Sequence, residues 1–207
     1  MLLSDAINPV RRRGSRSDDE YRAALERFRL LDDGVADVLS SIDDEYGAYD
    51  EDEYGQDMDS DTRGDMLKRE LRWMEGENEI LGKGGNRVVV RLSPRYAAKF
   101  AFVPKGDRQN RYENEVWKSI KDDPSLSDLF MPVHAIGMHG VMTEVALPCE
   151  GERAEQCETM IMRGQKRLKQ ALAQRQGVLQ GMSFNDADFY FNWGLHDGKT
   201  KLLDYGQ

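Results

Sequence analysis

Two neighbouring stretches give the first indication of the fold. They are Leu81-Gly82-Lys83-Gly84-Gly85-Asn86-Arg87-Val88-Val89-Val90 and, after the turn Ser93-Pro94-Arg95, Tyr96-Ala97-Ala98-Lys99-Phe100-Ala101-Phe102. A glycine-rich turn enters a β-branched run, and a second turn leads back into an apolar run. This pattern predicts two antiparallel strands. Glycines lack a Cβ and let backbone amides approach phosphate oxygens. By itself, however, the spacing Gly82-x-Gly84 indicates only a hairpin.

A lysine inside the second of these strands changes that interpretation. Lys99 stands in the apolar segment Ala-Ala-Lys-Phe, and an ammonium that points inward from such a strand needs an anionic partner. Residues 108–121 are predicted to form a helix, on which Glu113 is followed at +3, +4 and +7 by Val116, Trp117 and Ile120. This spacing places Glu113 on the inward face of the helix, whereas the nearby Glu115 is followed at +3 and +4 by Lys118 and Ser119, which suit a core poorly.

The elements that follow can also be expected from local patterns. Strands are predicted near 131–136 and 141–147, separated by the turn Gly137–Gly140. Apolar residues at helical spacing predict a long helix from residue 152 to about residue 179. The chain then closes with a hairpin, whose Asp197-Gly198 turn favours type I′.

The order of these features resembles the protein-kinase-like superfamily over nearly all of residues 79–207. The resemblance implies an α+β fold, with an antiparallel β small lobe that contains one helix, a reduced helical C-lobe, and N-terminal helices before them. The run from Leu81 to Val89 is similar to the glycine-rich loop, although Arg87 replaces the usual third glycine. Asn192-Trp193-Gly194 and Asp204-Tyr205-Gly206 are similar to the family's metal-binding asparagine and Asp-Phe-Gly motif.

The resemblance implies ATP and Mg²⁺ as ligands. Lys99 would hold phosphates and Glu113 would orient it. Thr143 would be the gatekeeper, and residues 144–146 would offer backbone groups to adenine. Asn192 and Asp204 would hold the metal, because carboxylate and amide oxygens suit Mg²⁺. The implied nucleotide-binding residues are Gly82, Lys83, Gly84, Gly85, Val89, Ala97, Lys99, Glu113, Thr143, Glu144 and Ala146.

Two departures from the family bear on activity. The proton-accepting aspartate normally lies five residues before the metal-binding asparagine, and Ala187 occupies that position here. A slip of one residue presents Asp188, or less favourably Asp186, so the resemblance implies Asp188, Lys99 and Asp204 as catalytic residues. The sequence also ends at Gln207, directly after Asp-Tyr-Gly. We therefore expect a C-lobe without an activation segment or peptide platform.

The N-terminal part carries the charge of the chain. The whole sequence has 29 Lys+Arg and 38 Asp+Glu, which gives −9, whereas residues 1–63 with 18 acids and 8 arginines give −10. We expect a mobile arm over 1–16, an amphipathic helix over 17–42, an acidic disordered linker over 43–61 and a helix leading into the core over 62–78. The kinase-like small lobe then covers 79–148 and the C-lobe 149–207. The amphipathic stripe either packs on its own domain, where it could cover the reduced C-lobe, or docks onto a partner.

Composition excludes several classes of protein. No apolar run is long enough for a membrane span or a signal peptide, and a neutral core with an anionic tail is a poor partner for nucleic acid. Cys149 and Cys157 match no zinc spacing, so we expect reduced thiols and a cytoplasmic location. His134, His139 and His196 are expected to be ordinary polar positions. The excess of Arg over Lys and the acidic tail hint at a halophilic or viral source, in which case the protein could be associated with the virion.

Three functions remain open at this point. The first is a minimal ATP- and Mg²⁺-dependent phosphotransferase that acts on a hydroxyl group. The second is a catalytically inactive pseudokinase that serves as a binding or structural module, in which nucleotide binding is retained or lost. The third is an α+β domain that only shares the order of the motifs.

Overall fold

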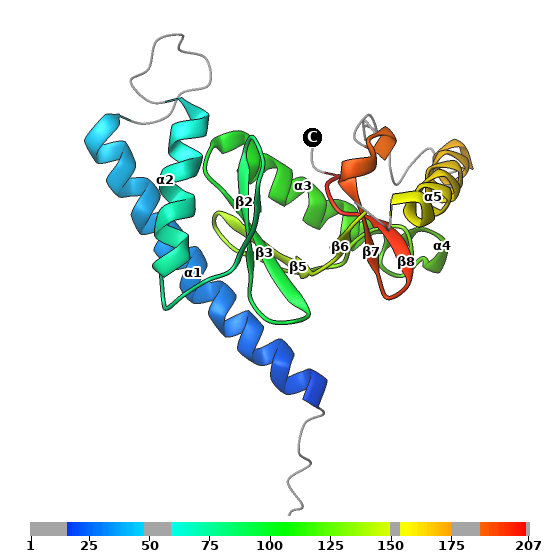
Figure 1. Ribbon diagram of the computed structural model, residues 1–207, viewed down its shortest axis with the longest axis horizontal. Helices are drawn as coiled ribbons and strands as arrows, with labels where there is room; N and C mark the ends of the chain where they lie inside the picture. Colours follow the sequence, from blue (N-terminus) through cyan, green and yellow to red (C-terminus); the bar gives the residue numbers. More distant parts are fainter. Residues whose placement is uncertain (1–15, 48–58, 150–153, 175–186, 206–207) are drawn as a thin grey trace, which may run out of the picture.

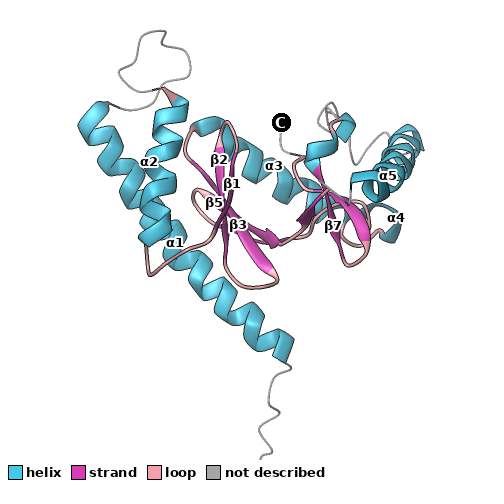
Figure 2. Cartoon of the chain, viewed as in Figure 1, coloured by secondary structure: helices cyan, strands magenta, loops and turns pink. Residues whose placement is uncertain are grey.

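The computed structural model describes residues 16–47, 59–149, 154–174 and 187–205, which form an α+β fold (Figure 1). Figure 2 shows helices at both ends of the molecule and strands between them. The elements are α1 Arg16–Tyr46, α2 Ser60–Trp73, β1 Ile80–Lys83, β2 Arg87–Arg91, β3 Tyr96–Ala101, α3 Pro104–Ile120, α4 Pro124–Ser127, β4 Val133–Ile136, β5 Gly140–Glu144, β6 Leu147–Pro148, α5 Ala154–Gln174, the 3₁₀ turn Tyr190–Asn192, β7 Trp193–His196 and β8 Lys199–Leu202.

The larger sheet is antiparallel and has the strand order β1-β2-β3-β5-β4. Its register pairs Val89 with Lys99 and Val88 with Phe100. Because successive side chains of a strand point to opposite faces, Arg87, Val89 and Lys99 share one face, while Val88 and Phe100 share the other. The alternation along β2 and β3 therefore separates a polar face of the sheet from an apolar one.

Helices α1 and α2 cover the apolar face of this sheet, and α3 lies on the other side (Figure 1). Phe28 of α1 stacks on Phe100, with ring centroids 6.0 Å apart. Of the predicted amphipathic stripe, Phe28, Leu31, Val35 and Ile42 are buried, and Tyr21, Leu25 and Val38 pack partly buried against the same core. Ala24 and Leu39 of α1 are also buried there. The stripe thus packs within the chain, as one of the two alternatives predicted.

A buried aspartate anchors α1 to the turn between β4 and β5. Asp32 accepts hydrogen bonds from the backbone N–H of Met138 at 2.6 Å and of His139 at 3.0 Å. A Cβ at Gly137 would lie 2.1 Å from an oxygen of Asp32, and one at Gly140 would lie 2.8 Å from the other. Glycine is needed at 137 because the Asp32 carboxylate comes so close, and at 140 also because the Phe100 ring would lie 2.6 Å from the Cβ.

A second core lies in the C-terminal part, by which we mean the described residues 147–149, 154–174 and 187–205. The small antiparallel sheet β6-β7-β8 packs with α5, α4 and the end of α3. Asp197 and Gly198 both have positive φ, 47° and 73°, as a type I′ turn requires. Tyr205 is buried against Phe130 and donates a hydrogen bond to the carbonyl oxygen of Met131. The segment that carries Asp204 is thereby fixed.

Several expectations need correction or fall outside the described residues. The helices α1 and α2 bury their apolar residues against the large sheet, so the prediction that they cover the reduced C-lobe is wrong. Helix α1 continues to Tyr46 and α2 begins at Ser60, so both ends of the predicted linker are helical. The stretches outside the described ranges include residues 1–15, which are most of the predicted arm; residues 48–58, which belong to the predicted linker; and residues 175–186, which include Asp186.

The two cysteines were expected to be reduced, and this prediction is wrong. Cys149 and Cys157 form a disulfide that joins the segment after β6 to α5. The sequence spacing of eight did not indicate the bond, because the approach of the two Cα atoms to 5.7 Å depends on how α5 packs.

Candidate nucleotide site

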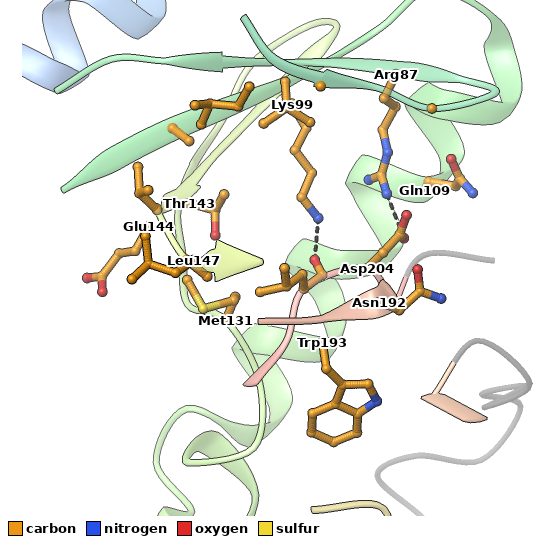
Figure 3. A pocket seen from close by; sticks show the side chains of 18 of the residues that line it. Arg87, Lys99, Gln109, Met131, Thr143, Glu144, Leu147, Asn192, Trp193 and Asp204 are labelled. Atoms are coloured by element: carbon orange, nitrogen blue, oxygen red, sulfur yellow. Dashed lines mark hydrogen bonds and ion pairs between the residues drawn. The ribbon is translucent and has the colours of Figure 1, made fainter. Parts of the chain in front are cut away.

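A cavity of about 700 Å³ lies between the polar face of the large sheet and the C-terminal part (Figure 3). Its volume falls within the range of about 300–1,000 Å³ typical of small-molecule sites. Gly82 of β1 and Gly84 and Gly85 of the β1–β2 turn border it, as do β2, β3, the end of β5 and the segment at 203–204. Of the residues predicted to bind nucleotide, those that line the cavity are Gly82, Gly84, Gly85, Val89, Ala97, Lys99, Thr143, Glu144 and Ala146.

Lys99 and Glu113 form the predicted ion pair. The Lys99 ammonium lies 2.9 Å from both carboxylate oxygens of Glu113, and both side chains are buried. Lys99 also donates to the carbonyl oxygen of Leu203, which joins the sheet to the C-terminal part. Burial lowers the pKa of Lys99, while the negative charge of Glu113 opposes that shift.

Arg87 adds a second buried cation on the same face of the sheet. Its guanidinium donates to Oε1 of Glu113 at 2.8 Å and to Oδ1 of Asp204 at 2.6 Å. A third bond reaches the side-chain oxygen of Asn110 at 3.1 Å. Burial alone would lower the pKa of Arg87, but the charges of Glu113 and Asp204 outweigh it and raise the pKa, so the cation is retained.

The four groups form one connected network, which we call the charge quartet: Arg87, Lys99, Glu113 and Asp204. Figure 3 shows Arg87 and Lys99 pointing from the sheet toward the segment that carries Asp204 and Asn192. The quartet contains two cations and two carboxylates. Three bonds of the Arg87 guanidinium, which has five N–H donors, go to Asn110, Glu113 and Asp204, whereas the three bonds of the Lys99 ammonium go to the two Glu113 oxygens and the Leu203 carbonyl oxygen.

The residues predicted to hold Mg²⁺ do not fit a metal in this arrangement. Asp204 and Asn192 both line the cavity, but Oδ1 of Asp204 is already bonded to the guanidinium of Arg87. A divalent cation on that carboxylate would lie within a few ångströms of a buried positive charge and would be repelled by it. In addition, no group of three or more His, Cys, Asp or Glu among the described residues is arranged to hold a metal ion.

At the other end of the cavity, Glu144 turns its side chain away from the space (Figure 3). Its carboxylate contacts Nε2 of His196 at 2.6 Å, Nε2 of His134 at 2.9 Å and the Arg95 guanidinium at 3.2 Å. Burial would raise the pKa of Glu144, but the bonds from both histidines and the charge of Arg95 lower it well below its usual range. Two of the three histidines therefore hold this segment, a role that their spacing did not reveal.

The backbone that follows Glu144 is partly engaged within the protein. The N–H of Val145 donates to the carbonyl oxygen of Arg95 at 2.7 Å, and Nδ1 of His196 lies 3.2 Å from the Val145 carbonyl oxygen. Thr143 directs its hydroxyl to the carbonyl oxygen of Pro132 at 2.9 Å. This edge of the cavity is thus rigidly held.

Two of the predicted site residues point elsewhere. Lys83 reaches α2, where its ammonium pairs with Asp65 at 3.0 Å and Asp61 at 3.3 Å. Asp188 is more than half exposed and pairs with Lys169 of α5 at 3.0 Å, and it is not among the residues that line the cavity. The structure therefore separates the expected proton acceptor from the charge quartet.

The cavity is also lined by residues that were not named as binding residues from the sequence: Leu81, Asn86, Arg87, Arg91, Gln109, Met131, Leu147, Cys149, Tyr190, Trp193 and Leu203. The alternation along β2 could have indicated Arg87, because it lies two positions before Val89 and so on the same face. Met131 and Leu203 gave no such signal, since they reach the cavity only through contacts between distant segments.

Comparisons with families and curated proteins add no functional information to this geometry. Neither a scan against models of protein families nor a search of curated proteins finds a match. Among the described helices, none has the length and apolar character to cross a membrane.

Proposed function

We propose that the chain is a protein-kinase-like, nucleotide-binding module that holds a nucleoside triphosphate such as ATP without transferring its phosphate. One observation carries the proposal: a glycine-rich turn, a strand lysine paired with a helix glutamate, and an aspartate far along the chain all meet at one cavity. These segments are distant in sequence and follow the order found in protein kinases. A domain that merely shares the order of motifs has no need to bring them together.

The cavity offers complementary surroundings for the two halves of a nucleotide. Val89 and Ala97 from the sheet, with Met131 across from them, provide apolar surfaces for a flat base. Thr143 and the backbone after it border the same end. Lys99 and Arg87 supply positive charge at the other end, where the backbone of the glycine-rich turn accommodates phosphate oxygens.

The position of Asp188 argues for a binding module over a phosphotransferase. A general base must lie within hydrogen-bonding reach of the hydroxyl it deprotonates, and this contribution is worth about 10²- to 10⁴-fold in rate. Asp188 is instead exposed and bonded to Lys169. The alternative, a minimal phosphotransferase, is favoured by one feature, the assembled pair of Lys99 and Glu113.

Binding can be tested by calorimetric titration of ATP into the full chain. We expect saturable binding that falls by about 10- to 100-fold in Lys99→Met, because a charge-assisted contact to phosphate is removed. Lys83→Met is a matched control, since Lys83 is a lysine of the same sheet that pairs with Asp65 of α2 and does not line the cavity. Equal effects of the two substitutions, or no binding at all, would contradict the proposal.

A phosphate-release assay distinguishes the two candidate functions. The binding module predicts no ATP turnover above a buffer blank, and no change in Asp188→Asn. Turnover in the wild-type chain that disappears in Asp188→Asn would instead establish the phosphotransferase.

A further inference from the structure

A buried arginine on β2 pairs with Asp204, the carboxylate that was predicted to hold a metal ion. Arg87 and Lys99 lie on neighbouring strands and on the same face, because Lys99 pairs with Val89, two residues from Arg87. Both cations line the cavity. The guanidinium bridges Glu113 on α3 and Asp204 near the C-terminus, which are 91 positions apart in the sequence.

The contacts of Arg87 match two tasks that a metal performs in phosphate binding. A metal neutralises the aspartate that would otherwise repel the phosphates, and it places positive charge on the phosphate oxygens. Arg87 does the first through its 2.6 Å bond to Asp204. The guanidinium has five N–H donors in a planar fork that suits phosphate, and three of its bonds go to Glu113, Asp204 and Asn110.

We propose that Arg87 takes the place of the divalent metal, so that this chain binds a nucleoside di- or triphosphate without Mg²⁺, with Arg87 and Lys99 holding the phosphates. The inference rests on the proposed nucleotide-binding function and specifies its chemistry. Asp204 then acts as the partner that positions Arg87, and the residue serves no metal.

The wild-type chain gives the first test, in which ATP is titrated in EDTA and again in excess Mg²⁺. We expect affinities that agree within about threefold. A gain of about tenfold or more on adding Mg²⁺ would overturn this inference and leave the proposed function intact. Absence of binding in both buffers would overturn the proposed function and this inference with it.

The variant Asp204→Asn distinguishes a residue that positions Arg87 from one that binds a metal, because the two roles predict different changes in the affinity for ATP. If Asp204 only positions Arg87, asparagine keeps an acceptor oxygen for the guanidinium while the charge quartet gains a net positive charge, and the affinity for ATP stays equal or rises in EDTA and in Mg²⁺ alike. If Asp204 holds a metal, the affinity in Mg²⁺ falls by about tenfold or more. Asparagine keeps the shape of the side chain, so the fold is expected to survive.

Arg87→Gln completes the series. We expect about a tenfold or greater loss of affinity in EDTA and a partial recovery in Mg²⁺, because Asp204 becomes accessible to a cation. Arg63→Gln is the matched control: it also removes a buried arginine, one that pairs with Asp43 at 2.5 Å away from the cavity. An unchanged affinity of Arg87→Gln in EDTA would overturn the inference, as would an equal loss in Arg63→Gln.

Discussion

Nε2 of His196 lies 2.6 Å from Oε2 of Glu144, and this contact joins the last residue of β5 in the large sheet to β7 in the small one. The two sheets form opposite walls of the cavity, so the contact fixes their separation at the end opposite the charge quartet. His134 and Arg95 bind the same carboxylate from β4 and from the turn before β3. Asp197 also lies within 3.4 Å of His196.

This contact predicts a pH dependence of stability. The bond to Glu144 raises the pKa of His196 above its ordinary 6.5, so its contribution is complete below that value and lost as pH rises through the raised pKa. The lowered pKa of Glu144 gives a contribution that is complete above its ordinary 4.5 and lost as pH falls through the lowered pKa. The contact therefore stabilises most between these two ordinary values.

We expect Glu144→Gln to lower the free energy of unfolding by about 2–3 kcal/mol near the middle of that window, and by less in alkaline solution. Urea denaturation at about pH 6 and at about pH 9 measures the difference. An equal loss of unfolding free energy at both pH values would show that the charge of His196 plays no part.

The anchor between α1 and the β4–β5 turn predicts coupling between two positions. Asp32→Ala leaves the N–H groups of Met138 and His139 without their acceptor and should cost about 2–4 kcal/mol. Gly137→Ala should also be destabilising, because its Cβ meets the Asp32 carboxylate. In the double variant the costs should not add, since removing the carboxylate makes room for the methyl group. Strict additivity in thermal denaturation would contradict this explanation of Gly137.

The disulfide predicts that the protein is more stable when oxidised. Closing a short loop between Cys149 and Cys157 should contribute about 2–3 kcal/mol. Melting temperatures with and without dithiothreitol measure this contribution. The Cys149→Ser, Cys157→Ser double variant should melt like the reduced protein and be insensitive to reductant; a wild-type melting temperature unaffected by reductant would refute the prediction.

The helix α1 is predicted to be an integral part of the fold. Removing residues 1–47 would expose the sheet face that Phe28, Leu31 and Val35 bury. Each such side chain contributes about 1.5–3 kcal/mol, so their sum approaches the whole stability of a typical domain. We expect the shortened chain to lose cooperative unfolding by circular dichroism. An unchanged melting temperature would show that the packing of α1 is dispensable.

Local sequence patterns predicted most of the strands and helices, because those elements depend on residues that are close together in the chain. The β-branched run around Val89 and the apolar run around Lys99 predicted the strands, and the resemblance to protein kinases implied the ion pair of Lys99 with Glu113 that the structure contains. The partners of Arg87 could not be predicted, because Asp204 lies 117 residues away and meets it only when the C-terminal part folds back. The same limit applies to Asp32, whose partners lie more than one hundred positions later.

Binding of ATP in the cavity beside the charge quartet can be measured by amide hydrogen exchange of the full chain with and without ATP. With ATP, we expect slower amide exchange than without it at residues 82–86, the glycine-rich segment, and at residues 143–146. Both effects should be absent in Lys99→Met. Unchanged exchange at these two segments under saturating ATP, or protection confined to the exposed surface of α5, would contradict binding in this cavity.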